Sequence, residues 1–277
     1  MSEFREPTWR TSLLNWPGEW AKVWAFARRG WIMTRRNVFT LVEMTFWPCI
    51  GLASIGLLTE FLSLTPETRA FVLIGVISLS VVQVCQLDVA YALLFDMWSK
   101  SVKYQFMAPI HGGHLVAGAW LMGILRGSVV FGLMSLFGMY AFDFSFVGSG
   151  LLPLAIFIVG LFLNGALVGI LTCTLILSFG ARAEMAAWTL VSVMLLLCGI
   201  YYPVSQLPPP LALAAGLIPL TYFLEYFRAF YGFPLTFAAP LWRGFALGFL
   251  YLAGGLALLH WAIQRARRNG ILLKLSE

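Results

Sequence analysis

The polar side chains of this sequence do not form a nucleotide-binding or catalytic motif. A P-loop requires Gly-Lys followed by Ser or Thr, because backbone amides and one lysine hold the phosphates. The lysines follow Ala21, Ser99, Val102 and Leu273, so no Gly-Lys pair exists. The motifs His-Glu-x-x-His and Gly-x-Ser-x-Gly do not occur either. We therefore predict that this chain is not an enzyme and binds no cofactor of its own.

The histidines and cysteines do not indicate a metal site. Two glycines separate His111 from His114, and no cysteine or carboxylate lies close to them in the sequence. A turn at the start of the next apolar segment therefore explains this pair better than a metal does. The cysteines form no Cys-x-x-Cys pair and lie inside apolar stretches, which indicates small buried side chains rather than a zinc site or disulfides. They are Cys49, Cys85, Cys173 and Cys198.

A few charged residues lie inside long apolar stretches, where charge is costly. Arg126 lies near the middle of the stretch 114–141, and an arginine at the centre of a membrane costs about 2.5–3.5 kcal/mol on insertion scales. Glu43 and Asp88 lie inside other apolar stretches and Asp96 directly follows one, all nearer to the end that we place in the cytoplasm below. We expect Arg126 to pair across helices with Asp88 or Glu43. The pair either stabilises the packing of the helices or belongs to a transport pathway in which Arg126 binds an anionic group of the cargo.

The high apolar and low charged content of the chain indicates a membrane protein. Apolar residues make up 60% of the chain and charged residues only 11%, whereas soluble domains contain about 25% charged residues. Basic residues stand at the ends of apolar segments rather than on a polar face of their own, which argues against nucleic acid as a partner. The sequence predicts an all-α integral membrane protein with short connections.

Six apolar segments are long enough to cross a bilayer, which takes at least about 18 residues. We place them at 38–62, 70–95, 114–141, 151–179, 184–201 and 241–263. Lys and Arg gather on the side of the N-terminus, so the positive-inside rule places both termini in the cytoplasm. The predicted organisation has three parts: a cytoplasmic N-terminus at 1–36, a six-span domain at 37–264 and a cytoplasmic tail at 265–277.

Residues 17–36 show the pattern of an amphipathic helix. Its apolar side carries Trp20, Val23, Trp24, Ala27 and Trp31, and its other side carries Lys22, Arg29 and Arg36. Indole rings favour the headgroup region, so this helix is predicted to lie in the membrane interface. A helix packed on the cytosolic side is the alternative.

Residues 202–232 are too broken by proline for one span. The apolar run 211–218 is short, and a second short piece follows that carries Glu225 and Arg228. Short runs of this kind are typical of re-entrant or interfacial helices. We predict a helical hairpin that enters from the outer side, with Pro203 at its start and Glu225 paired to Arg228 as a structural or gate contact.

The segment 97–114 joins two predicted spans on the cytoplasmic side. It is too polar to insert, yet it has apolar positions such as Val102 and Phe106, and Ala108-Pro109 ends it. A short amphipathic helix parallel to the membrane and an ordinary loop fit this pattern equally well.

Taken in order along nearly the whole chain, several motifs resemble the permease subunit of ABC-2-type exporters. They are Phe46-Trp47-Pro48, Asp96-Met97-Trp98, Ala108-Pro109, Phe179-Gly180-Ala181-Arg182-Ala183-Glu184 with Trp188, Tyr201-Tyr202-Pro203-Val204 with Leu207-Pro208, and Pro219 to Arg228. The resemblance lies in the ordered set, since no single motif is as diagnostic as a P-loop.

The resemblance implies that six spans form one half of a dimer, built from two copies of this chain or from this chain and a related permease. It also implies two copies of a separate ATPase that binds ATP and magnesium, in a bacterial inner membrane. The loop between the second and third spans would be a coupling helix in contact with that ATPase. On this chain the contact residues would be Trp98, Lys100, Lys103, Tyr104, Phe106 and Pro109.

The sequence does not identify the cargo, although its abundant aromatic residues suit a lipid, a lipid-linked glycan or a hydrophobic drug. A secondary transporter driven by an ion gradient is the alternative. Such transporters usually have broken helices in both halves of the chain, whereas this sequence predicts a broken element only in its C-terminal half. A membrane-embedded enzyme is disfavoured because no nucleophile–base or metal constellation is found. A purely structural membrane subunit is the remaining possibility.

Overall fold

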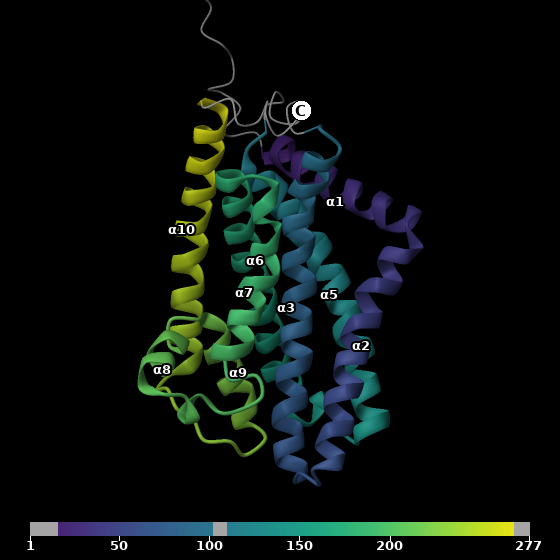
Figure 1. Ribbon diagram of the computed structural model, residues 1–277, viewed down its shortest axis with the longest axis vertical. Coiled ribbons are helices and arrows are strands. Elements are labelled where there is room, and N and C mark those ends of the chain that lie inside the picture. Colours follow the sequence, from purple (N-terminus) through teal and green to yellow (C-terminus); the bar gives the residue numbers. More distant parts are fainter. Residues whose placement is uncertain (1–15, 102–109, 269–277) are drawn as a thin grey trace, which may run out of the picture.

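A computed structural model describes residues 16–101 and 110–268, and within these residues all regular structure is helical (Figure 1). Five of the described helices are long and apolar enough to cross a membrane, or six if a bent pair of short helices counts as one span. The chain is an integral membrane protein. The count of six separate spans stays a prediction.

The long helix α3 (Pro66–Trp98) is the centre of the bundle. Thr65 caps it, because its hydroxyl oxygen accepts a hydrogen bond from the Thr68 amide, and Pro66 occupies the first turn, where no amide donor is needed. Of the most apolar 18-residue part of α3, 78% is buried inside the protein. The helices that pack most extensively on it are α5 (Gly112–Phe142) and α6 (Leu151–Phe179).

Small residues allow α5 and α6 to approach α3 closely. A Cβ atom on Gly123 of α5 would lie 2.9 Å from the sulfur of Cys85, and one on Gly165 of α6 would lie 2.7 Å from the Cys85 Cβ. Cys85 is fully buried between them, as the sequence predicted for a small apolar side chain. These contacts hold the three helices side by side without space for a larger residue.

Helices α2 (Val38–Phe61) and α10 (Pro240–Arg268) lie at the edges of the bundle. Only 17% of the apolar part of α2 and 22% of that of α10 is buried within the protein. Exposed apolar side chains on them, such as Phe61, Leu57 and Phe249, suit lipid or another protein surface.

The N-terminal helix α1 (Trp16–Arg36) packs lengthwise against the first half of α5. Successive contacts advance four residues at a time on α5 and three or four on α1, and they join Glu19 to His114, Val23 and Ala27 to Gly118, Gly30 to Met122 and Thr34 to Arg126. The tryptophans Trp20, Trp24 and Trp31 stay exposed. The predicted helix is thus present, but its apolar side is divided, since Val23 and Ala27 face α5. Its location in the membrane interface stays a prediction.

The fifth predicted span, 184–201, is shorter than expected. After α6 a 3-10 turn, η3 (Ala181–Glu184), leads into α7 (Met185–Leu197), which has 13 residues. At 1.5 Å per residue, this helix is about 20 Å long, short of a bilayer core of about 30 Å. Gly180 and Gly199 flank this segment with positive φ angles of 84° and 69°, which interrupt helical geometry on both sides.

Short helices occupy the end of the molecule opposite to α1 (Figure 1). They are η2 (Phe146–Ser149), η4 (Val204–Gln206), α8 (Pro209–Ala215) and α9 (Pro219–Ala229). Helices α8 and α9 meet at 90°, the geometry of a broken span or a re-entrant loop. The Thr221 hydroxyl donates to the Ala215 carbonyl at 2.9 Å, and the Tyr222 hydroxyl donates to the Gly216 carbonyl at 2.6 Å. These bonds satisfy the last carbonyls of α8 and hold the bend.

Candidate functional site

A groove of about 930 Å³ runs between α1, α2, α3, α5 and α7. Helix α3 supplies one whole face of it, at steps of three and four residues from Val76 to Phe95. That distance is about 28 Å at 1.5 Å per residue, so the groove runs along most of the thickness of a bilayer core.

The walls of the groove are apolar over most of its length and polar where it meets α1. The apolar walls include Met44, Trp47 and Ile55 of α2 and Trp188, Val191 and Leu195 of α7. The polar part contains Arg29, Thr34, Arg36, Asn37, Asp88 and Arg126. This arrangement suits a ligand that has one apolar and one polar part.

Arg126 of α5 pairs with Asp88 of α3, which is one of the two partners that the sequence predicted. The guanidinium also donates to the hydroxyl oxygen of Thr34 in α1, and that hydroxyl donates to the Gly30 carbonyl at 2.7 Å. Both pair members are largely buried, and the second carboxylate oxygen of Asp88 and the Nε of Arg126 have no partner in the described structure. Glu43, the other predicted partner, lies in α2, and its side chain is outside the described part of the protein.

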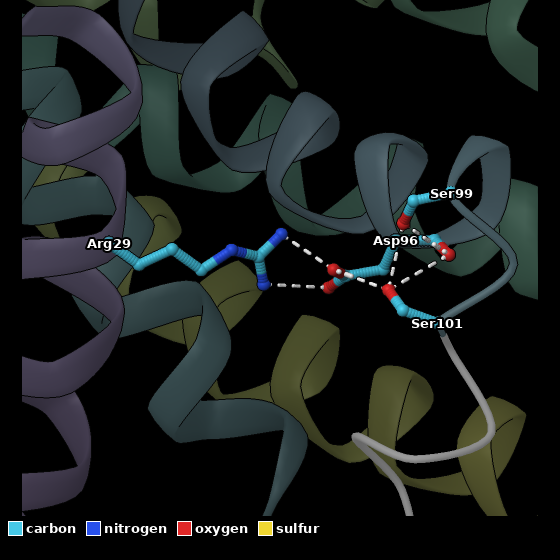
Figure 2. A network of polar contacts seen from close by, with 4 residues as sticks. All are labelled: Arg29, Asp96, Ser99 and Ser101. Carbon is cyan, nitrogen blue, oxygen red and sulfur yellow. Dashed lines mark hydrogen bonds and ion pairs between the residues drawn. The ribbon is translucent and has the colours of Figure 1, made fainter. Parts of the chain in front are cut away.

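A second ion pair, which sequence reasoning missed, joins Arg29 of α1 to Asp96 in the last turn of α3 (Figure 2). Both guanidinium nitrogens donate to the carboxylate, at 2.5 and 3.0 Å. The Ser101 hydroxyl donates to the same carboxylate at 3.2 Å. The Asp96 side chain is only 5% exposed, so its charge is compensated by this bidentate contact. The available signal was that Asp96 and Asp88 are eight residues apart on α3, which places them toward the same side.

A third polar cluster ties the start of α1 to the start of α5. The carboxylate of Glu19 lies 2.6 Å from the Lys22 ammonium and 2.5 Å from Nε2 of His114. Its pKa is lowered, chiefly by the hydrogen bond from Lys22 and then by His114. The His111 amide donates to Nδ1 of His114 at 3.1 Å, and α5 begins at Gly112. The turn that the sequence predicted at this histidine pair is therefore confirmed.

The predicted ATPase contact lies at the end of α3 and just beyond it. Trp98 is the last residue of α3 and is 48% exposed. Lys100 follows in a tight turn with a positive φ of 57°. The other members, Lys103, Tyr104, Phe106 and Pro109, lie outside the described residues. Whether this segment is a helix or a loop stays open.

Glu225 and Arg228 do not form the direct ion pair that the sequence predicted, although their opposite charges still attract each other at longer range. Their role as a gate contact stays a prediction. Both side chains are described, and no ion pair joins them. Glu225 instead accepts hydrogen bonds from the amides of Thr236 and Phe237, at 3.3 and 3.2 Å. Pro203, the third predicted gate residue, caps η4 and is half-buried. One helical turn separates the two charges, but Glu225 binds backbone amides that follow α9, whereas Arg228 binds backbone carbonyls at the ends of other helices.

Arg228 is buried at 3% exposure and binds backbone carbonyls. Its guanidinium donates to Gly199 and Ile200 after α7, at 2.6 and 2.9 Å, and to Phe71 of α3 at 2.8 Å. It also lies 3.5 Å from the centroid of the Phe71 ring, a cation–π contact. Arg228 therefore fastens α9 to the ends of two other helices.

Comparison with known proteins places this architecture in a family. The model of the ABC-2 type transporter family matches residues 21–231, from α1 through α9 and including all five helices that line the groove. A shorter match is to an uncharacterized protein of Archaeoglobus fulgidus, 39% identical over 61 residues, which cover 22% of this chain and 95% of that protein. Because the family model covers most of the chain, this protein belongs to the ABC-2 type transporter family and is one of its transmembrane permeases.

Proposed function

We propose that this chain is the permease subunit of an ATP-driven exporter that works with a separate ABC ATPase. Two permeases, either two copies of this chain or this chain and a related one, form the pathway, and two ATPase subunits bind ATP and magnesium. The observation that carries the proposal is the amphipathic groove, which is lined by helices of the matched family region. This chain contributes binding and movement, and the catalytic step occurs on the partner.

The proposed cargo is an amphiphile such as a lipid, a lipid-linked glycan or a hydrophobic drug. The groove, at about 930 Å³, falls in the range of about 300–1,000 Å³ found for pockets that hold small ligands. Trp47, Ile55 and Leu195 would contact the apolar part. Arg126 and Asp88 would lie close to the polar part, because they stand where the groove becomes polar.

The proposed orientation places the end of the bundle that carries α1 in the cytoplasm. Lys and Arg are concentrated on this side of the apolar segments, and the positive-inside rule relates that excess to the cytoplasmic face of an inner membrane. The opposite end, with α8 and α9, would then be a re-entrant outer element. Both termini would be cytoplasmic, and the segment that follows Trp98 would face the ATPase.

ATP can drive such a cycle only if it binds one conformation more tightly than the other. In the proposed mechanism the closed ATPase dimer binds one arrangement of the segment from Trp98 to Pro109. The membrane-spanning helices of the permease then change their arrangement with that segment. Tyr104→Ala combined with Phe106→Ala should therefore uncouple ATP hydrolysis from transport while the permease still folds. Unchanged transport by this variant in proteoliposomes would contradict the assignment of the contact.

The whole proposal is tested by purifying the permease together with its ATPase and reconstituting the complex in proteoliposomes. Movement of a fluorescent phospholipid should require ATP and stop with a Walker-B variant of the ATPase. Transport that persists without nucleotide and collapses with an ionophore would instead identify a secondary transporter. A permease that purifies without any ATPase and moves lipid alone would overturn the proposal.

A further inference from the structure

Asp96 joins α1 to the end of α3 and to the turn that directly follows α3. Its carboxylate holds Arg29 of α1 with two hydrogen bonds, and it accepts a third from the Ser101 hydroxyl. Its backbone carbonyl accepts the Ser101 amide at 2.8 Å. Ser101 is the last described residue before the segment 102–109 (Figure 2). Any displacement of that turn therefore acts directly on the carboxylate that Arg29 binds.

Helix α1 carries a second polar contact five residues beyond Arg29. Thr34 accepts a hydrogen bond from Arg126, which pairs with Asp88 in the middle of the groove. A chain of contacts thus leads from Ser101 through Asp96 to α1, and from α1 to the Arg126 pair. The α1 residues between the two contacts, Gly30 and Met33, line the groove as well.

Helices α1 and α5 approach each other closely at two glycines. Gly118 of α5 faces the α1 backbone, where a Cβ atom would lie 2.6 Å from the Val23 carbonyl. Gly30 of α1 faces the Met122 side chain, whose Cγ would lie 2.9 Å from an added Cβ atom. Small residues at these positions bring the two helices into close contact, so a displacement of α1 acts directly on α5.

We propose that α1 is a brace that carries movement of the turn at 99–101 to the Arg126–Asp88 pair and the groove wall, and that Arg29 is the positioning residue of this link. The proposal rests on the proposed function, because it assumes that a partner moves this turn. The two ion pairs differ in a way that suits such roles. Both oxygens of Asp96 have partners, so the link to the turn is firm. Asp88 Oδ2 and Arg126 Nε have none in the described structure, and because an unsatisfied buried polar atom is costly, a rearrangement that gives these atoms partners would be favoured.

The first experiment measures cargo moved per ATP hydrolysed by the full transporter in proteoliposomes, with fluorescent phospholipid as the probe. Arg29→Gln and Asp96→Asn should each lower this ratio by about fivefold or more, a size typical of coupling between two sites. The double variant should be no worse than either single one, because the pair acts as a unit. Arg29→Lys keeps the charge but loses the bidentate contact, and it should fall between wild type and Arg29→Gln.

Arg28→Gln is the matched control, because it removes the same charge one residue away. Arg28 is exposed and forms no ion pair with another described side chain. A merely structural role for Arg29 would lower the yield of assembled complex and leave the transport ratio of the remaining complex intact. That result, or equal ratios for Arg28→Gln and Arg29→Gln, would overturn the brace.

The second experiment locks α1 in place. A Cβ atom on Gly30 would lie 3.6 Å from the Met122 Cβ, within the range of about 3.5–4.5 Å that a disulfide requires. Gly30→Cys with Met122→Cys, in a Cys49→Ser background, should lose transport on oxidation and regain it on reduction. The reduced protein is its own control. Full transport by the oxidised form would show that α1 does not need to shift.

These outcomes separate the brace from the proposed function. If wild-type protein shows no transport that depends on ATP, the proposed function fails. If wild type transports with ATP but the Arg29 variants and the locked form keep the wild-type ratio, only the brace fails.

Discussion

Gly75 of α3 makes room for the buried guanidinium of Arg228. A Cβ atom at position 75 would lie 2.7 Å from Nη2 of Arg228 and would collide with the Ile200 carbonyl, which accepts a hydrogen bond from that guanidinium. The end of α7, the start of α3 and helix α9 therefore meet at a point where only glycine fits.

Gly75→Ala should lower the free energy of unfolding by about 1–3 kcal/mol, because the added methyl group must displace a bound cation and a carbonyl. Thermal unfolding of the purified permease in detergent measures the change. Gly132→Ala is the control, because nothing lies within 4 Å of a Cβ atom there and alanine is the better helix former. Equal stability of the two variants would contradict the close packing at Gly75.

Glu225 and Arg228 should show only weak energetic coupling, because they bind different backbone groups and only a longer-range attraction between their charges remains. Arg228→Gln should destabilise the protein strongly, since it leaves three buried carbonyls without their charged donor. Glu225→Gln should have a smaller effect. A double-mutant cycle on unfolding free energies should give an interaction energy below about 0.5 kcal/mol. An interaction energy well above this value would support the direct ion pair that the sequence predicted.

Removal of one member of the Arg126–Asp88 pair should cost more than removal of both. Asp88→Asn leaves the Arg126 guanidinium buried without its counter-charge, for which about 3–5 kcal/mol is typical. Asp88→Asn together with Arg126→Gln should be less damaging than the sum of the single changes. The measurement is unfolding in detergent, followed by transport of the same variants. If Arg126→Gln leaves both stability and transport intact, the pair has neither a structural nor a pathway role.

Gly118→Val should push α1 away from α5, because the Phe26 Cβ and the Val23 carbonyl occupy the space for a side chain. Ala27 is buried at this contact, so a cysteine at position 27 reports on the separation. Maleimide labelling of Ala27→Cys should be faster in the Gly118→Val background. Gly113→Val on the same helix, where nothing lies within 4 Å of an added Cβ atom, serves as the control and should leave labelling unchanged.

Apolar length predicted most of the long helices, because a run that must satisfy its backbone in lipid has few options besides a helix. The segments 38–62, 70–95, 114–141, 151–179 and 241–263 correspond to α2, α3, α5, α6 and α10. The segment 184–201 was predicted too long. Gly180 and Gly199 were visible in the sequence, but their positive φ angles depend on the turns that the surrounding helices impose.

The sequence by itself determined that this chain is a helical membrane protein and that Arg126 needs a buried partner, because hydropathy and the cost of an unpaired charge are local properties. Only the tertiary structure decided that the partner is Asp88, that Arg29 binds Asp96 and that Arg228 binds carbonyls instead of Glu225. These contacts join residues that are 29 to 157 positions apart. Which of several spaced charges meet depends on how the helices pack and turn about their axes, and glycines such as Gly118 and Gly75 set that packing.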